Sequence, residues 1–68
     1  MTKEQALQAM IDGEKVTHRY FSSDEYIYMV AQNIFTEDGF DCGTVNQAFW
    51  RQRDGENWET GWSLYEGN

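Results

Sequence analysis

Residues 15–31 of this chain, KVTHRYFSSDEYIYMVA, hold the pattern that decides the expected fold. Two runs rich in β-branched and aromatic residues, 15–21 and 25–31, are typical of strands. The segment Ser22-Ser23-Asp24 between them has the chemistry of a turn. We therefore expect an antiparallel hairpin. Both faces of its second strand are largely apolar, so one face can pack on a helix and the other needs a second cover.

A helix is expected at residues 3–12, before the hairpin. Thr2-Lys3-Glu4-Gln5 matches the capping box, in which a hydroxyl and a carboxamide satisfy the first free backbone amides. Gly13 stands where a left-handed cap would end the helix. The apolar residues recur at helical spacing and form one stripe: Ala6, Leu7, Met10 and Ile11.

Three further elements are expected after the hairpin. Ile34-Phe35 predicts a third strand that turns at Asp38-Gly39. Thr44-Val45-Asn46-Gln47 is a second capping-box match and opens a short helix, which Asp54-Gly55 ends. A last strand is expected at residues 61–66. The order α-β-β-(β)-α-β predicts an α+β fold, one small domain over residues 1–68 with an antiparallel sheet packed on a helix.

Composition narrows the classes of function. Twelve acidic residues against five basic ones give a net charge of −7, which disfavours direct binding to nucleic acid or to an anionic membrane. The single cysteine, Cys42, cannot form an internal disulfide, and no Cys/His cluster suggests a metal or another cofactor. The chain shows neither a membrane-spanning run nor a signal peptide, so we expect a cytoplasmic protein.

The residues that could carry catalysis lack partners in the sequence. His18 is the only histidine, and no nucleophile or carboxylate is placed beside it by the expected fold. The acidic pairs Asp24-Glu25 and Glu37-Asp38 lie in turns, where such residues are common. No nucleotide or metalloprotease motif occurs. We therefore expect a protein that is not an enzyme.

The acidic residues of the second half suggest a surface that binds a partner protein. Trp62, which alternates with Leu64, and Phe49, four residues after Val45, are expected in the core. The candidate partner-binding residues are Glu37, Asp38, Asp41, Asp54, Glu56 and Glu59 with Trp50 and Trp58. Carboxylates that steer and aromatic rings that anchor would suit a basic protein groove. Capping of the open sheet face explains the two tryptophans equally well. An ordinary solvated acidic surface explains the same acids equally well.

The layout of the whole chain resembles small proteins encoded by tailed phages and prophages. The shared features run from Gly13 and Glu14-Lys15-Val16 through His18-Arg19-Tyr20-Phe21 to Phe49-Trp50 and Trp58-x-x-Gly61-Trp62. The opening part, from Ala6-Leu7 through Gly13-x-Lys15-Val16, is also similar to the anti-Thoeris sponge family, whose oligomers sequester a nucleotide signal. That family typically has Arg where His18 stands and Trp where Phe21 stands.

The resemblance implies an accessory or counter-defence protein of the bacterial cytoplasm. It would bind and inhibit a host protein, such as a CRISPR complex or restriction enzyme, and compete with nucleic acid for that protein. A second hypothesis is an oligomer that sequesters a nucleotide, with His18, Arg19, Tyr20 and Phe21 at a subunit interface. A third is a structural phage component that forms a homo-oligomer.

Overall fold

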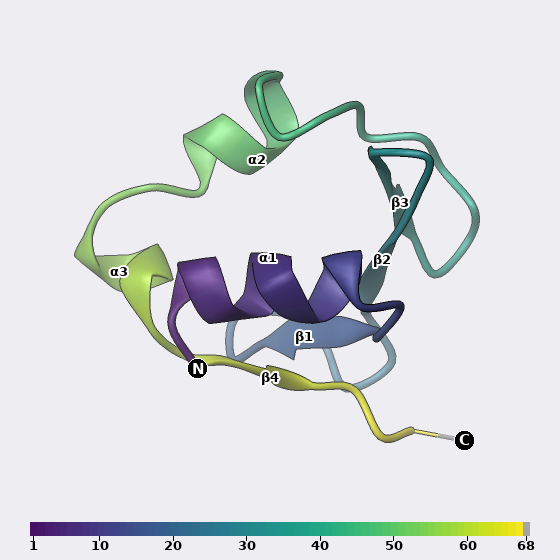
Figure 1. The fold of residues 1–68 in the computed structure, drawn as a ribbon. Coiled ribbons are helices and arrows are strands. Elements are labelled where there is room, and N and C mark those ends of the chain that lie inside the picture. Colours follow the sequence, from purple (N-terminus) through teal and green to yellow (C-terminus); the bar gives the residue numbers. More distant parts are fainter. Residues whose placement is uncertain (68) are drawn as a thin grey trace.

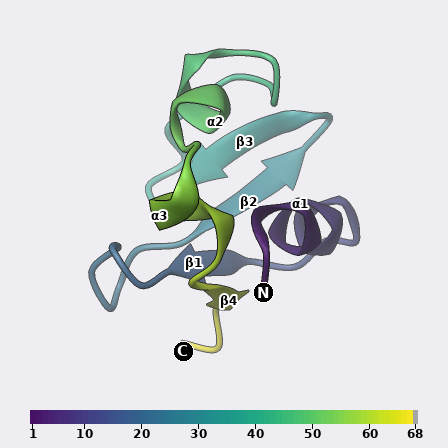
Figure 2. The same ribbon diagram turned by 90° about the vertical axis from the view of Figure 1, so that its left-hand side faces the viewer.

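The computed structural model describes residues 1–67 and shows three helices packed on a four-stranded antiparallel sheet. In chain order the elements are α1 (Lys3–Ile11), β1 (Val16–His18), β2 (Ile27–Val30), β3 (Asn33–Thr36), α2 (Ala48–Gln52), α3 (Glu56–Glu59) and β4 (Trp62–Leu64). The strand order is β3-β2-β1-β4, which runs from top to bottom in Figure 2. The predicted α+β class is confirmed.

Helix α1 has the predicted start. The Gln5 backbone N–H donates to the Thr2 hydroxyl at 3.1 Å, and the Thr2 N–H donates to Gln5 Oε1 at 2.9 Å. The helix ends at Ile11, one residue earlier than expected. Gly13, at φ +93°, follows it in the left-handed region and donates its N–H to the Met10 carbonyl. Reciprocal capping thus sets where α1 begins.

Strands β1 and β2 pair antiparallel as predicted, but both are shorter than the expected runs. Val16 and Ile27 are their one register pair. After His18 the chain turns, because the Tyr20 N–H donates to the His18 ring and the Phe21 N–H donates to the His18 carbonyl. This turn ends β1 and replaces the long hairpin that the sequence predicts.

The third strand is confirmed, and two turns bound it. Ala31 and Gln32 form a two-residue loop between β2 and β3, with φ of +50° and +73°. Positive φ at both positions matches the twist of a tight hairpin. The predicted turn at Asp38-Gly39 is also present: Gly39 has φ +81° and donates its N–H to the Thr36 carbonyl.

The second capping-box match does not begin a helix. The Thr44 N–H donates to Gln47 Oε1 at 3.0 Å, but the Thr44 hydroxyl accepts from Asn46 rather than from Gln47. Helix α2 therefore starts at Ala48, after this turn. A further short helix, α3, occupies the segment around Trp58, where a loop was expected.

All three helices pack on one face of the sheet. Val16 and Ile27 from the strands meet Met10 of α1 and Trp50 of α2 in the same buried cluster. The sheet is bent, so that β1 and β4 lie below α1 while β2 and β3 rise to one side of it (Figure 1). The core fills this concave side. Its buried apolar members are Ala6, Met10, Val16, Ile27, Ile34, Trp50 and Trp62.

Candidate binding surface

His18 lies inside the molecule, at the centre of an aromatic cluster. It is 2% exposed, and its ring centroid lies 4.3 Å from that of Trp58 and 4.7 Å from that of Trp62. Its Nδ1 accepts the Tyr20 N–H at 3.1 Å, so Nε2 carries the proton and donates to the Thr60 carbonyl at 2.8 Å. Both ring nitrogens are therefore occupied by the backbone.

Burial suppresses the reactivity of the two groups that ordinarily suggest chemistry. Burial lowers the pKa of His18, which keeps the imidazole neutral. Burial likewise raises the pKa of the half-buried Cys42 thiol, which disfavours the nucleophilic thiolate. Neither side chain has the freedom of a general base or a nucleophile.

Within the single chain, the four residues of the ligand-binding hypothesis do not line one common pocket, and the pocket at a subunit interface stays a prediction. His18 faces the core, and the half-buried Phe21 lies with its ring centroid 6.0 Å from that of Trp62. Tyr20 is exposed, and the Arg19 guanidinium lies 5.5 Å from its ring centroid. His18 and Phe21 thus pack inward, whereas Tyr20 is exposed with its ring 5.1 Å from that of His18 between centroids. Arg19 is exposed.

Trp50 is buried, so the expectation that it is an exposed anchor is wrong. It is 6% exposed, and its ring centroid lies 5.3 Å from that of Trp62. We expected Phe49 and Val45 to lie on one inward face of a helix, but α2 begins only at Ala48 and Val45 lies outside it. With that pairing lost, Trp50 turns inward and Phe49 lies half-buried against the core.

Trp58 is half-buried and belongs to the same internal cluster. Its carbonyl accepts the Trp62 indole N–H at 2.7 Å. The Arg53 guanidinium lies 3.8 Å from the Phe49 ring centroid and 5.3 Å from that of Trp58. Trp58 therefore contributes to packing and presents only part of its surface to a partner.

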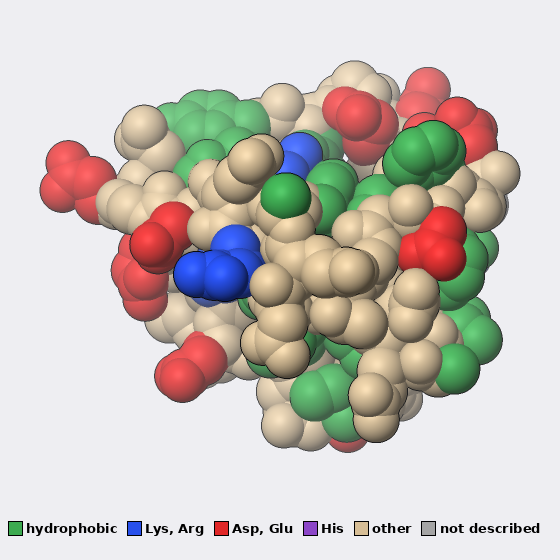
Figure 3. All heavy atoms as spheres, turned by 90° about the horizontal axis from the view of Figure 1, so that it is seen from above, with side chains coloured by type: hydrophobic (Ala, Val, Ile, Leu, Met, Phe, Trp, Pro, Cys, Tyr) green, Lys and Arg blue, Asp and Glu red, His purple; other side chains and the backbone are tan. Residues whose placement is uncertain are grey.

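The six predicted acidic residues form two groups rather than one surface. Asp54, Glu56 and Glu59 lie in or beside α3, whereas Glu37, Asp38 and Asp41 follow β3. These two elements stand at opposite ends of the molecule in Figure 1. Figure 3 likewise shows acidic side chains toward both ends of the face seen from above. The structure does not gather all six around Trp58.

Asp41 and Glu37 accept hydrogen bonds that hold the segment after β3. Asp41 accepts hydrogen bonds from the Asn33 side chain at 2.9 Å and from the Gly43 N–H at 2.8 Å, and these bonds lower its pKa. Glu37 accepts from the Tyr26 N–H at 3.4 Å. The carboxylates of Asp41 and Glu37 thus help to hold the segment after β3 in place.

The opposite, outer face of the sheet carries a row of aromatic rings that the sequence analysis did not single out. Alternation along the strands places Tyr28 and its register partner Phe35 on the face away from the core. Their rings stack, with centroids 5.8 Å apart. Tyr26 lies 6.1 Å from Tyr28 and 4.5 Å from Tyr65, both measured between ring centroids.

This row, which we call the outer aromatic row, consists of Tyr65, Tyr26, Tyr28 and Phe35. All four rings are half-buried, and none of the helices in residues 1–67 packs over them. A partly exposed row of neighbouring rings, of which Tyr28 and Phe35 are stacked, is suited to contact with another molecule.

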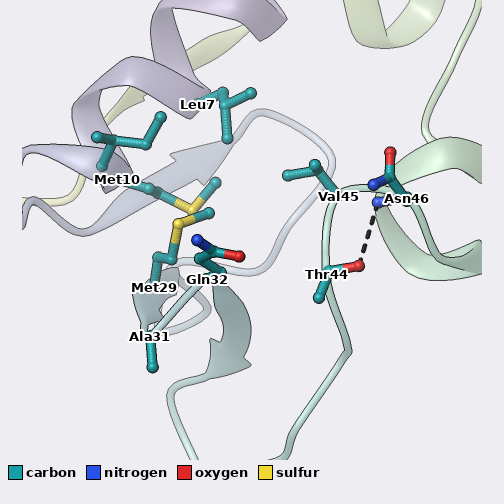
Figure 4. Close-up of a pocket in the computed structure, with 9 residues that line it drawn as sticks. Leu7, Met10, Met29, Ala31, Gln32, Thr44, Val45 and Asn46 are labelled. Atoms are coloured by element: carbon teal, nitrogen blue, oxygen red, sulfur yellow. Dashed lines mark hydrogen bonds between the residues drawn. The ribbon is translucent and has the colours of Figure 1, made fainter.

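A separate apolar pocket of about 550 Å³ lies between α1, the β2–β3 turn and the segment before α2. In Figure 4 the Met10 and Met29 side chains approach each other, with Leu7 and Val45 beside them. The nine lining residues include no charged side chain: Leu7, Met10, Ile11, Met29, Ala31, Gln32, Thr44, Val45 and Asn46. A phosphate group would find no cation in this pocket.

The described part of the chain contains no group of three or more His, Cys, Asp or Glu that could hold a metal ion. Over the same residues, no helix is long and apolar enough to cross a membrane. Comparison with protein-family models, with curated proteins and with solved structures found no match. The case for a function therefore depends on the geometry of the chain itself.

Proposed function

We propose that this chain is a small, non-catalytic binding module that recognises a basic protein through the outer face of its sheet. The observation that carries the proposal is the outer aromatic row, which crosses the uncovered sheet face. Partly exposed Tyr and Phe rings are the kind of rigid, amphipathic surface that anchors protein interfaces. Tyr28 and Phe35, at the stacked end of the row, are its proposed anchors.

The distribution of charge favours a basic partner. Lys3, Lys15 and Arg53 each lie over an aromatic ring of the chain itself. Within residues 1–67, none of the side-chain hydrogen bonds joins a Lys or Arg to a carboxylate; those of Lys3 and Arg53 go to backbone carbonyls. The exposed carboxylates that accept no hydrogen bond within residues 1–67 can steer a cationic surface toward the module; among the predicted acidic residues these are Asp38, Asp54, Glu56 and Glu59.

The same charge supports an inhibitory role of the kind that the resemblance to phage proteins suggests. A protein that binds nucleic acid presents Lys and Arg to phosphates. An acidic module bound to that surface would exclude the nucleic acid by occupying the site and by repelling phosphate. In this proposal the partner is a host defence protein, and inhibition needs no reaction.

The test is capture of partners on immobilised chain at low and high salt from a bacterial lysate. We expect a basic, nucleic-acid-binding protein to be retained at low salt and released at high salt. Tyr28→Ser, in the outer aromatic row, should abolish this capture. Tyr20→Ser removes an exposed tyrosine away from that row and should leave capture unchanged.

Circular dichroism would first establish that both variants remain folded. Equal capture by the two variants would refute the outer face as the binding surface. Capture that does not respond to salt would refute the electrostatic part of the proposal. Loss of capture in Tyr28→Ser but not in Tyr20→Ser, together with release of the partner by salt, supports both the binding face and the electrostatic part of the proposal.

A further inference from the structure

One edge of the sheet presents backbone groups that no neighbouring strand uses. In the β1–β4 ladder the Arg19 N–H donates to the Gly61 carbonyl at 3.0 Å and the Tyr65 N–H donates to the Lys15 carbonyl at 2.9 Å. Backbone groups alternate in direction along an antiparallel strand. The N–H and C=O of Leu64 therefore point away from β1, toward solvent.

Only part of this edge is occupied. The Met1 amino nitrogen donates to the Trp62 carbonyl at 2.9 Å, which covers the start of β4. Leu64 is 41% exposed, and none of the hydrogen bonds found within residues 1–67 uses its N–H or C=O outward from the sheet. An open edge of this kind can pair with an added strand.

The opposite edge of the sheet is protected. The Ile34 N–H donates to the Gly43 carbonyl at 2.8 Å, and the Cys42 N–H donates to the Ile34 carbonyl at 2.7 Å. The segment after β3 thus folds back and covers that edge. Of the two edges, β4 is the one open to a partner.

A groove of about 430 Å³ lies beside the β4 edge, along α1. Its floor includes the small side chain of Ala9 and the exposed Leu64. The carboxylates of Asp12 and Glu14 also line it, and its lining includes no Lys or Arg: Met1, Gln5, Gln8, Ala9, Asp12, Glu14 and Leu64. The groove holds the Met1 ammonium at the start of β4, is apolar beside Leu64, and is acidic at Asp12 and Glu14.

We propose that the β4 edge at Leu64 binds an extended, basic segment of a partner protein as a fifth strand. Backbone hydrogen bonds to Leu64 would supply the pairing. Alternate side chains of the added strand would enter the groove, where Asp12 and Glu14 favour Lys or Arg. The intervening side chains would lie next to Tyr65, at the near end of the outer aromatic row.

The charge of the chain favours a basic segment of another protein over a second copy of the chain as the strand bound at the β4 edge. Each copy carries a net charge of −7, and pairing two β4 edges would bring Asp12 and Glu14 of both copies toward the same seam. Like charges at a shared seam oppose association. A basic segment would instead neutralise these carboxylates. The inference rests on the proposed function, because it assumes a basic protein partner.

The experiment measures amide hydrogen exchange by NMR on the whole chain, with a synthetic peptide as the probe. The probe is a capped peptide in which lysine alternates with valine, and the matched control replaces each lysine by glutamate. In the free chain we expect fast exchange at Leu64 and slow exchange at Ser63, whose N–H faces β1. The lysine peptide should slow exchange at Leu64, and the glutamate peptide should bind on the order of tenfold more weakly or not at all.

Two substitutions at Leu64 distinguish the contribution of its backbone N–H to peptide binding from the contribution of its side chain. Leu64→Pro removes the outward N–H without breaking a β1–β4 bond, so the fold should survive and peptide binding should be lost. Leu64→Ala keeps the N–H and should retain most of the binding. If Leu64→Pro proves unfolded, the exchange measurement on the unaltered chain with the two peptides still shows whether a basic strand binds at Leu64.

The outcomes also distinguish this inference from the proposed function. Peptide binding that shifts the Tyr28 and Phe35 signals but leaves Leu64 exchange unchanged would overturn the edge-strand site and support the sheet face. Protection of Leu64 without peptide, rising with chain concentration, would show a second copy and overturn the proposal. Binding of neither peptide at any position would overturn it as well.

Discussion

Replacing Gly61 by Ala should destabilise the chain more than the same change at Gly55. Both glycines have positive φ, +93° and +88°, so each Ala costs about 1–3 kcal/mol of backbone strain. A Cβ at Gly55 would meet nothing within 4 Å. At Gly61 it would lie 3.0 Å from His18 Nε2 and 3.1 Å from Arg19 Nε.

The contact with His18 accounts for the difference. To relieve it, the imidazole must shift by a few tenths of an ångström, which strains its 2.8 Å hydrogen bond to the Thr60 carbonyl, and weakening such a bond costs about 0.5–1.5 kcal/mol. Gly61→Ala should therefore lose about 0.5–1.5 kcal/mol more than Gly55→Ala. A chain of this size is stable by roughly 3–10 kcal/mol, so both losses are measurable.

Urea unfolding followed by tryptophan fluorescence is the assay, because Trp58 and Trp62 both contact the His18 ring. The two variants should share the slope of the wild type and differ in midpoint. Equal midpoints for Gly61→Ala and Gly55→Ala would show that His18 does not depend on its bond to Thr60. The account of the internal cluster would then be wrong.

Three further predictions concern the same fold. Because burial lowers the pKa of His18 in the folded chain, the unfolded chain takes up a proton first as the pH falls. The contribution of His18 to stability should therefore be complete above a pH of about 6.5 and decrease below it. Urea midpoints measured across pH should show this decrease in the wild type and lose it in a His18→Gln variant. Trp50→Ala should cost about 3–5 kcal/mol in urea unfolding, since it empties a buried site against Trp62, and a loss below about 1 kcal/mol would contradict its burial. Changing Ala31 to Asn and Gln32 to Gly should raise the thermal midpoint, with a gain of about 1 kcal/mol, because both positions have positive φ; a lower midpoint would rule out the two-residue turn.

Local signals in the sequence predicted the elements whose causes are local. The Thr2 and Gln5 side chains cap α1 as expected, because every group in that motif lies within one turn. The turn at Ala31-Gln32 was not predicted, since neither residue favours positive φ. It forms because Met29 pairs with Ile34 and both side chains are drawn toward the core. Burial across the hairpin thus outweighs the preference of the turn residues.

The candidate site was harder to predict than the fold because it depends on contacts between residues that are distant in the sequence. The pattern at Thr44 predicts a start for α2 a few residues too early, and the Val45–Phe49 pairing built on that start left Trp50 outside the core. In the structure Trp50 is buried and Phe49 is half-buried against the same core. A five-residue helix is too short for its apolar pattern to reveal which face turns inward. The outer aromatic row did have a signal, the alternation of Tyr26 and Tyr28, but its meaning required the neighbours in β3 and β4.

The aromatic rings of this chain connect its stability to its charge. A chain with no disulfide gains buried area from Trp50 and other rings, and Lys3 and Arg53 lie over aromatic rings. The rings hold these cations in place, although the charge of each cation still offsets part of the acidic charge nearby. In the outer row Lys15 lies 4.8 Å from the centroid of Tyr26. Within residues 1–67 no Lys or Arg lies over Tyr28, so a Lys or Arg of a basic partner would find its free ring face there.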